Sequence, residues 1–399
     1  MLPVTLSPGA ERKLVLLLAA MQFAHIMDFM VMMPLGPQLM RVLNISTDQF
    51  GWLVSAYTLT AGVAGFISVF LVDRFDRRHA LTTLFAGFLL ATLACGLATD
   101  FHLLLAARCM AGMFGGVLTA IIMALIADCF PESKRGAVTG KVMSGFALAA
   151  VAGVPMGIYL ANHFDWRMPF FLIAALSLPL LLLLPRWLPS VPARDEGPVR
   201  IIGTLREVMG DRNHVYAFVL VSALMLAGFS VIAYISPYMV QNVGLTEAQL
   251  PLIYLWGGLG TLITAPFIGK LSDHFGRVRT FQVACMFSII PLLVLTQLTV
   301  VPLLFVLIVT SAFMMLIGGR VIAAIALFGS ISHPHLRGRF LSFNSAVQQV
   351  ASGVAAFLPT LILSQSADGK MLHYDLVGYG AVIMTLLCIW LAGRLEIRG

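Results

Sequence analysis

Charged residues are scarce in this sequence. Lys, Arg, Asp and Glu together make up 11% of the 399 residues, whereas soluble domains contain roughly a quarter. Hydrophobic residues make up 59%, and the mean hydropathy is +0.94. So few charges do not cover a water-exposed surface of this size, which excludes a soluble domain. The composition predicts an integral membrane protein whose surroundings are the lipid bilayer.

Cysteine is also scarce, and its pattern excludes several kinds of site. The five cysteines are odd in number, lie in or at the ends of apolar runs and show no paired spacing. We therefore expect neither disulfides nor a metal site. The sequence also contains no nucleophile beside a base and no phosphate-binding loop at a membrane boundary, so we expect neither an enzyme nor a bound cofactor.

What the sequence does contain is a series of twelve apolar runs, each long enough to cross a bilayer as a helix. They cover roughly residues 14–38, 49–72, 79–99, 102–127, 138–161, 168–188, 214–241, 249–271, 279–299, 301–328, 340–364 and 375–394. The sequence therefore predicts an all-α membrane protein with twelve transmembrane helices.

The basic residues are distributed unevenly between the two sides of these spans. Of the 25 Lys and Arg, Arg41, Arg167 and Lys370 fall on one side, Arg108 and Arg320 lie within spans, and the other twenty fall on the side of the N-terminus. Because basic loops stay in the cytoplasm, we expect both termini there, in a multi-pass protein of the cell membrane, the inner membrane in a bacterium. Topology also accounts for the net charge of +7, so no nucleic-acid partner is expected.

The chain divides into two similar halves. Only the connection 189–213 is long and polar, and it separates an N-terminal bundle (1–188) from a C-terminal bundle (214–399) of six spans each. Similar segments recur at an offset near 200, including Pro37 and Pro237. The others are Ser46-Thr47-Asp48-Gln49 with Thr246-Glu247-Ala248-Gln249, and Asp73-Arg74-Phe75-Asp76-Arg77 with Asp273-His274-Phe275-Gly276-Arg277. We expect two pseudo-symmetric six-helix bundles that rock around a site between them, in a monomer.

One of these repeated segments carries a family resemblance. Gly269-x-x-x-Asp273-x-x-Gly276-Arg277-x-Arg279, with Asp73-Arg74-x-x-Arg77-Arg78 as its partner, resembles the cytoplasmic loop signature of the major facilitator superfamily. An Asp at a helix end followed by a turn and cations is able to latch neighbouring helix ends, so we expect gating roles. The expected gating residues are Asp73, Arg74, Arg77, Asp273 and Arg277. The alternative is that the cations only set the topology. The first copy departs from the family pattern at Val69 and Asp76, where glycines are usual.

Two further segments resemble the drug/proton antiporters and sugar-efflux members of that superfamily. Arg108 is similar to an arginine of the fourth span that works with an acid on the first span, and Gly153-Val154-Pro155-Met156-Gly157 is similar to the antiporter motif. Gly153 and Gly157 allow close helix packing and Pro155 removes a helix hydrogen bond, so these three complete the expected gate. Gly and Pro are, however, common in any membrane helix.

The first span contains three polar residues on one helical face, Gln22, His25 and Asp28, which are spaced three residues apart. A carboxylate within a bilayer is costly and marks a functional site. Asp28 is the only one of the 18 acidic residues that does not lie in a loop or at the end of an apolar run. We therefore expect Asp28, with Arg108 and His25, to couple transport to protons. The alternative for His25 is a hydrogen bond to a neighbouring helix.

Further polar and aromatic residues within spans are candidates for a substrate cavity. They are Gln22, Arg320, Asn344, Gln348, Phe229 and Tyr234. Arg320 has no buried acid in its own half, which leaves water, backbone carbonyls or an anionic substrate as partners. The aromatic residues have packing as an alternative.

Together these observations predict proton-coupled export of a small organic solute by alternating access, with protons as the coupling ion. An anionic solute is one of the alternatives that Arg320 leaves open. Proton-coupled uptake uses the same parts and stays open. A non-transporting signalling or scaffold protein of the same fold also stays open, although only the connection 189–213 is long enough to dock a partner.

Overall fold

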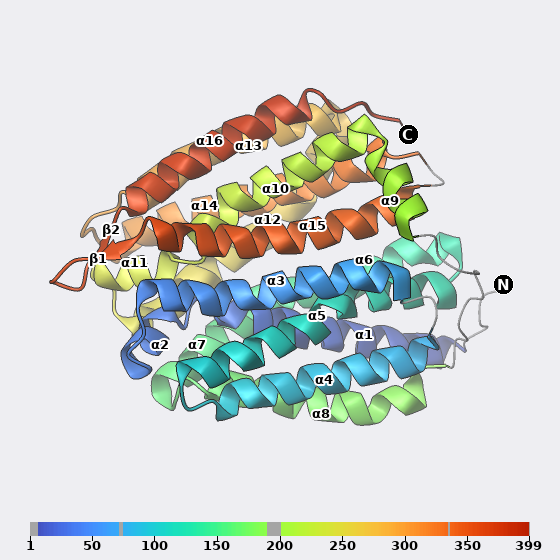
Figure 1. The fold of residues 1–399 in the computed structure, drawn as a ribbon, viewed down its shortest axis with the longest axis horizontal. Helices are drawn as coiled ribbons and strands as arrows, with labels where there is room; N and C mark the ends of the chain where they lie inside the picture. Colours follow the sequence, from blue (N-terminus) through green and yellow to red (C-terminus); the bar gives the residue numbers. More distant parts are fainter. Residues whose placement is uncertain (1–6, 72–74, 190–200, 334–335, 399) are drawn as a thin grey trace.

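The computed structural model describes residues 7–71, 75–189, 201–333 and 336–398. Long helices lie side by side in two groups, one from each half of the chain, and both termini lie at the same end of the molecule (Figure 1). We call this the terminal end. The opposite end, which carries α2, α11, β1 and β2 in Figure 1, is the distal end.

The first group runs from α1 to α8. Its elements are α1 (Pro8–Val31), α2 (Gly36–Val42), α3 (Thr47–Leu71), α4 (Arg77–Leu97), α5 (Phe101–Cys129), α6 (Glu132–Leu148), the π-helical turn η2 (Ala149–Gly153), α7 (Val154–His163) and α8 (Met168–Trp187).

The second group begins with a short helix in the predicted connection. Its elements are α9 (Ile201–Met209), α10 (Arg212–Ile232), α11 (Ile235–Gln241), η3 (Glu247–Gln249), α12 (Leu250–Phe275), α13 (Arg277–Thr296), α14 (Leu303–Ile331), α15 (Arg337–Phe357), η4 (Leu358–Leu361), β1 (Ser364–Gln365), β2 (Met371–Leu372) and α16 (Tyr374–Ala392).

Among the described residues, 11 helical segments are long and apolar enough to cross a membrane. The predicted span that is not among these 11 is 340–364. It corresponds to α15, which has 21 residues but carries Asn344, Gln348, Gln349 and several serines. This polarity is tolerable because α15 packs along α3 at the boundary between the two groups (Figure 1). The polar helix is thus one of the two elements that meet there.

Two predicted spans are interrupted in the same way near the distal end. Helix α1 ends at Val31 and α2 begins at Gly36, and α10 ends at Ile232 before α11 begins. A Cβ atom on Gly36 would lie 2.8 Å from the ring of Phe50 and 3.0 Å from Pro237 of the other half. The break therefore lets the two chain halves approach closely at the distal end.

The two halves also contact each other through their longer helices. Helix α3 packs against α15, and α12 packs against η2 and α7. A Cβ on Gly62 of α3 would lie 2.5 Å from Val350 of α15, so the backbones approach closely there. Nearer the terminal end, the rings of Phe66 and Phe70 lie 5.5 Å and 5.8 Å from that of Phe343.

The repeated turn before α4 and α13 is closed differently in the two halves. Gly276, the N-cap of α13, has φ +90°, a conformation that favours glycine. Asp76 at the equivalent place has φ −55°, and its carboxylate accepts hydrogen bonds from the backbone amides of Arg78 and His79 at 2.9 Å and 3.0 Å. The departure from the family pattern at Asp76 is therefore accompanied by a side-chain helix cap.

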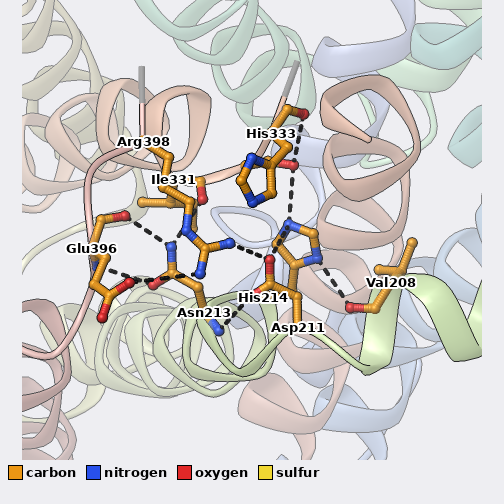
Figure 2. Close-up of polar contacts among 9 residues, drawn as sticks. Val208, Asp211, Asn213, His214, Ile331, His333, Glu396 and Arg398 are labelled. Atoms are coloured by element: carbon orange, nitrogen blue, oxygen red, sulfur yellow. Dashed lines mark hydrogen bonds and ion pairs between the residues drawn. The ribbon is translucent and has the colours of Figure 1, made fainter. Parts of the chain in front are cut away.

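A polar cluster joins the end of the chain to α10 at the terminal end (Figure 2). The amide nitrogen of Asn213 donates to the backbone oxygens of Ile331 (2.9 Å) and Glu396 (2.8 Å), and Arg398 forms an ion pair with Asp211. Burial alone raises the pKa of Asp211, but the amide of Asn213 and the guanidinium of Arg398 outweigh it and hold this pKa below its ordinary value. The segment after α16 is thereby fixed to α10 and α14.

The same cluster holds α9 against the second group. The buried ring of His214 lies between the backbone oxygen of Val208 and the hydroxyl of Ser332, at 3.0 Å from each (Figure 2). Arg339 of α15 pairs with Glu207 of α9 at 3.2 Å. The helix inside the predicted connection is therefore attached to the second half.

Candidate functional site

A fully buried ion pair joins α1 to α5. Arg108 donates from Nη1 to the carboxylate of Asp28 at 2.9 Å and to its backbone oxygen at 3.3 Å. The second carboxylate oxygen accepts a hydrogen bond from the hydroxyl of Thr92 on α4 at 3.2 Å. The structure thus brings together the acid and the arginine that the sequence singled out, and hydrogen-bonds both carboxylate oxygens.

Tyr57 of α3 connects this pair to His25. The guanidinium carbon of Arg108 lies 4.5 Å from the centre of the Tyr57 ring, a cation–π contact. The Tyr57 hydroxyl lies 2.8 Å from Nδ1 of His25. A Cβ on Gly115 of α5 would lie 2.4 Å from that hydroxyl and 3.0 Å from Nδ1. The missing side chain at Gly115 therefore makes room for the contact between Tyr57 and His25.

The polar face of α1 is directed into the first group of helices. Gln22 exchanges hydrogen bonds with the hydroxyl of Thr119 on α5, at 3.2 Å and 3.3 Å. Gln22, His25 and Asp28 all contact helices of their own half, so they share one face as predicted. The neighbouring Phe29 contacts Tyr57 at 5.4 Å and Phe229 of the other half at 6.0 Å, measured between ring centres. Phe29 therefore links the buried cluster to the boundary between the halves.

Arg320 lies inside the second group and, within the described part of the chain, has no acidic partner. Its Nη1 donates to the hydroxyl of Thr385 at 3.1 Å and to that of Ser288 at 3.5 Å. Among the described residues, its Nε and Nη2 have no hydrogen-bond partner, although the side chain is fully buried. The partners of Arg320 are therefore hydroxyls of α13 and α16, and one edge of the guanidinium has none.

The other cavity candidates lie near the boundary. The hydroxyl of Tyr234 donates to the backbone oxygen of Ala356 at 2.8 Å, and its ring packs edge-on against Phe50 of the other half at 6.1 Å. Asn344 is buried, and its side-chain oxygen has no hydrogen-bond partner in the part of the chain that the structure describes, while Gln348 is half-buried.

The structure describes only some of the predicted gating residues. Asp73 and Arg74 lie outside the described residues. Arg77 donates from Nε to the carboxylate of Asp128 on α5 at 3.2 Å, and both side chains are nearly buried. Asp273 is exposed, and neither it nor Arg277 forms an ion pair within the described ranges. The second copy of the motif therefore makes no ion-pair latch among these residues.

The segment Gly153-Val154-Pro155-Met156-Gly157 packs against α1 beside the buried pair. A Cβ on Gly153 would lie 3.2 Å from Met27, and one on Gly157 would lie 2.8 Å from Val31. Pro155 stands in the first turn of α7, directly after the π-helical turn η2, where a missing backbone N–H is tolerated. On its other side η2 touches α12 of the second half. This segment therefore connects α1 to α12.

The sequence reasoning missed the residues that surround the predicted ones. Tyr57, Thr92 and Thr119 supply the contacts of His25, Asp28 and Gln22, but single hydroxyls within apolar runs carry no signal of their own. Their partners were identifiable only once the helices were placed side by side.

It also missed an ion pair that joins the halves at the distal end. Arg41 of α2 pairs with Glu247 of η3, and Arg41 Nη2 lies 3.1 Å from Glu247 Oε2. Asn162 of α7 donates to the backbone oxygen of Glu247 at 2.9 Å. In the sequence, Arg41 is one of the few cations on the less basic side and Glu247 is part of a repeated segment, and neither position indicates the other as its partner.

Comparisons with known proteins agree with this architecture. A model of the Major Facilitator Superfamily matches the chain twice, over residues 18–221 and 217–397. Among solved structures, a D-xylose-proton symporter has a TM-score of 0.78 at 17% identity, with 96% of this chain and 97% of that chain covered. A bacterial homolog of the human lysosomal transporter Spinster has a TM-score of 0.74 at 14% identity, with 98% of each chain covered. These likenesses concern the fold.

Curated relatives are transporters of the same kind. An uncharacterized MFS-type transporter, YceJ of Bacillus subtilis (strain 168), is 28% identical over 254 residues, 63% of this chain and 65% of YceJ. The putative transporter AraJ of Escherichia coli (strain K12) is 25% identical over 287 residues, 71% of each chain. A probable sugar efflux transporter of Mannheimia succiniciproducens is 24% identical over 222 residues, 55% of each chain. The match spans less than two thirds of YceJ. With two matches to the family model and the repeated helical halves in agreement, the chain belongs to the major facilitator superfamily, a family of secondary transporters rather than enzymes.

Proposed function

We propose that this transporter exports a small organic solute in exchange for protons, with Asp28 as the proton carrier. The observation that carries the proposal is the buried pair of Asp28 with Arg108 at 2.9 Å, which has no counterpart among the described residues of the second half. A buried carboxylate paired with a guanidinium has two stable arrangements, ionised and bound to Arg108, or protonated and released from it. Any solute or conformation that draws Arg108 away favours protonation of Asp28.

The surroundings of the pair supply a route from protonation to movement of the halves. Tyr57 stacks on Arg108 and contacts Phe29, whose ring touches Phe229 of the second half. Release of Asp28 from Arg108 frees the guanidinium to shift against the Tyr57 ring. We propose that this shift changes how α1 packs against α10, which is the coupling that alternating access requires.

The distal end is proposed to face the outside. Basic residues concentrate at the terminal end, as the positive-inside rule requires of the cytoplasmic side. The ion pair of Arg41 with Glu247 and the close approach of Gly36 to Pro237 then hold the outer ends of the halves together. These contacts open in the outward-facing orientation, while Asp73, Arg74, Arg77, Asp273 and Arg277 are proposed to act at the cytoplasmic end.

Export is favoured over uptake by the resemblance of the segment 153–157 to the antiporter motif and by the similarity to a probable sugar efflux transporter. Uptake remains a second candidate because a D-xylose-proton symporter shares the fold. The solute is proposed to bind between the halves, near Phe229, Tyr234, Asn344 and Gln348.

The test is the sign of the pH change inside vesicles. Purified protein is placed in vesicles that contain a fluorescent pH indicator, and solutes are added outside without a pH gradient. The panel pairs D-xylose with D-xylonate and D-glucose with D-gluconate, and adds an aromatic cation. Exchange of solute for protons makes the interior alkaline, and this sign does not depend on how the protein is inserted.

Acidification of the interior by a solute that enters would instead identify a symporter and overturn the proposed direction. Radiolabelled solutes that cross without any pH change would overturn proton coupling altogether. Empty vesicles and vesicles with heat-inactivated protein give the background for both readings.

A further inference from the structure

Arg320 is a buried guanidinium with one unoccupied edge. Thr385 and Ser288 hold Nη1, whereas Nε and Nη2 make no hydrogen bond within the described part of the protein. Nε and Nη2 lie on the same edge of the guanidinium and donate in parallel, the arrangement that matches the two oxygens of a carboxylate or phosphate. A buried unpaired charge is costly, so a function that requires it is expected.

The free edge of Arg320 faces Gly228, the position in the second half that is equivalent to Asp28 in the first half. Gly228 precedes Pro237 by the same number of residues as Asp28 precedes Pro37, so the two positions are equivalent in the repeat. A Cβ on Gly228 would lie 3.1 Å from Nη2 of Arg320. In the first half an arginine of α5 meets a carboxylate on α1, and in the second half an arginine of α14 meets a glycine on α10.

The site adjoins the boundary where the solute is proposed to bind. Gly228 is followed by Phe229, whose ring lies 6.0 Å from that of Phe29 in the first half. A group that enters from this boundary along α10 meets the free edge of Arg320 without crossing a side chain at position 228.

We propose that Arg320 and Gly228 form an anion-accepting subsite, which binds a carboxylate or phosphate group of the transported solute in the place of the missing acid. The inference rests on the proposed transport function and specifies the substrate class. Ser288 and Thr385 position the guanidinium through Nη1, and the anion receives two charge-assisted hydrogen bonds from Nε and Nη2.

The first test supplies the missing acid. Gly228→Asp places a carboxylate beside Nη2, and Gly228→Asn places a neutral side chain of the same size there. Nη2 is the end of a flexible side chain, so it yields to either residue. The melting temperature of the Asp variant is expected to exceed that of the Asn variant by at least about 2 to 4 °C. Equal melting temperatures, or a lower one for the Asp variant, would show that an anion beside the guanidinium does not stabilise the protein.

The second test adds anions to the purified protein. Acetate, D-gluconate, inorganic phosphate and chloride are compared at equal ionic strength, with D-glucose as the neutral partner of D-gluconate. Acetate or D-gluconate is expected to raise the melting temperature of the unmodified protein but not of Arg320→Gln or Gly228→Asp. Stabilisation by phosphate as well extends the accepted class to phosphate groups.

Two outcomes overturn the proposal. Stabilisation by chloride alone would assign the site to a resident inorganic ion, and an equal response of Arg320→Gln would place the binding elsewhere. Neither measurement depends on proton movement. A failure of the anion site is therefore distinct from a failure of proton exchange, which the vesicle assay detects as a missing pH change.

Discussion

Replacement of Asp28 by Asn tests stability and coupling separately. The variant keeps the shape of the side chain and an oxygen for the hydroxyl of Thr92, but it leaves the guanidinium of Arg108 without its counter-charge at 2.9 Å. Two unit charges about 4 Å apart at an effective dielectric constant of about 20 attract by about 4 kcal/mol. Removal of one partner of a buried pair costs about 3 to 5 kcal/mol in measured cases. We expect a loss of stability of this size.

The double variant Asp28→Asn with Arg108→Gln separates the two effects. Because it removes both charges, it is expected to recover most of the lost stability, since neither member of the pair is left as an unpaired buried charge. It is not expected to recover proton coupling, because the titrating group is still absent. Thermal unfolding of the purified variants gives the stability, and the pH indicator in vesicles gives the coupling.

Two results would refute this reasoning. A double variant as unstable as Asp28→Asn would show that the pair itself is not the source of the loss. Solute-driven pH changes of full size in Asp28→Asn would remove Asp28 as the proton carrier and direct attention to His25. Arg108→Gln alone, which leaves an unpaired carboxylate that is able to protonate, is expected to be less destabilised than Asp28→Asn.

Two further predictions concern the distal pair and the glycine beside the cluster. Arg41 and Glu247 are replaced by cysteines in a background without the five native cysteines, and a short thiol cross-linker that joins them is expected to stop transport. Each single-cysteine variant treated in the same way is expected to continue to transport. Transport by the cross-linked protein would mean that the distal end need not open. Gly115→Ala places a Cβ 2.4 Å from the Tyr57 hydroxyl, so it is expected to destabilise the protein by about 1 to 3 kcal/mol through overpacking. The exposed helical Gly140, with nothing within 4 Å of its Cβ, is the matched control, and an equal loss in Gly140→Ala would contradict the role of the Tyr57 contact.

Some predictions from the sequence agree with the arrangement of the residues in the structure. The three-residue spacing predicted that Gln22, His25 and Asp28 share one face, and the resemblance to the drug/proton antiporters implied that Arg108 works with an acid on the first span. The shared face follows from the fixed geometry of an α-helix, and the cost of burying a carboxylate singled out Asp28. The repeat at an offset near 200 matched Pro37 with Pro237, but it did not predict the breaks that follow α1 and α10.

Other features were not readable in the chain. The π-helical turn η2, the interruption between α1 and α2, and the short strands β1 and β2 depend on local backbone geometry that hydropathy does not encode. The hydropathy pattern also does not show that the polar helix α15 packs against α3 of the other half.

The sequence by itself determined the membrane class, the presence of long apolar spans and the identity of the charged residues within them, because hydrophobic thickness and the cost of burying charge act on composition and spacing alone. Only the tertiary structure decided which partners those charges have. Asp28 accepts hydrogen bonds from Arg108 and Thr92, whereas Arg320 donates to two hydroxyls and lies beside a glycine. Contacts between helices depend on their relative rotation and depth, and residues 80 or more apart in the chain carry no local signal that they will meet.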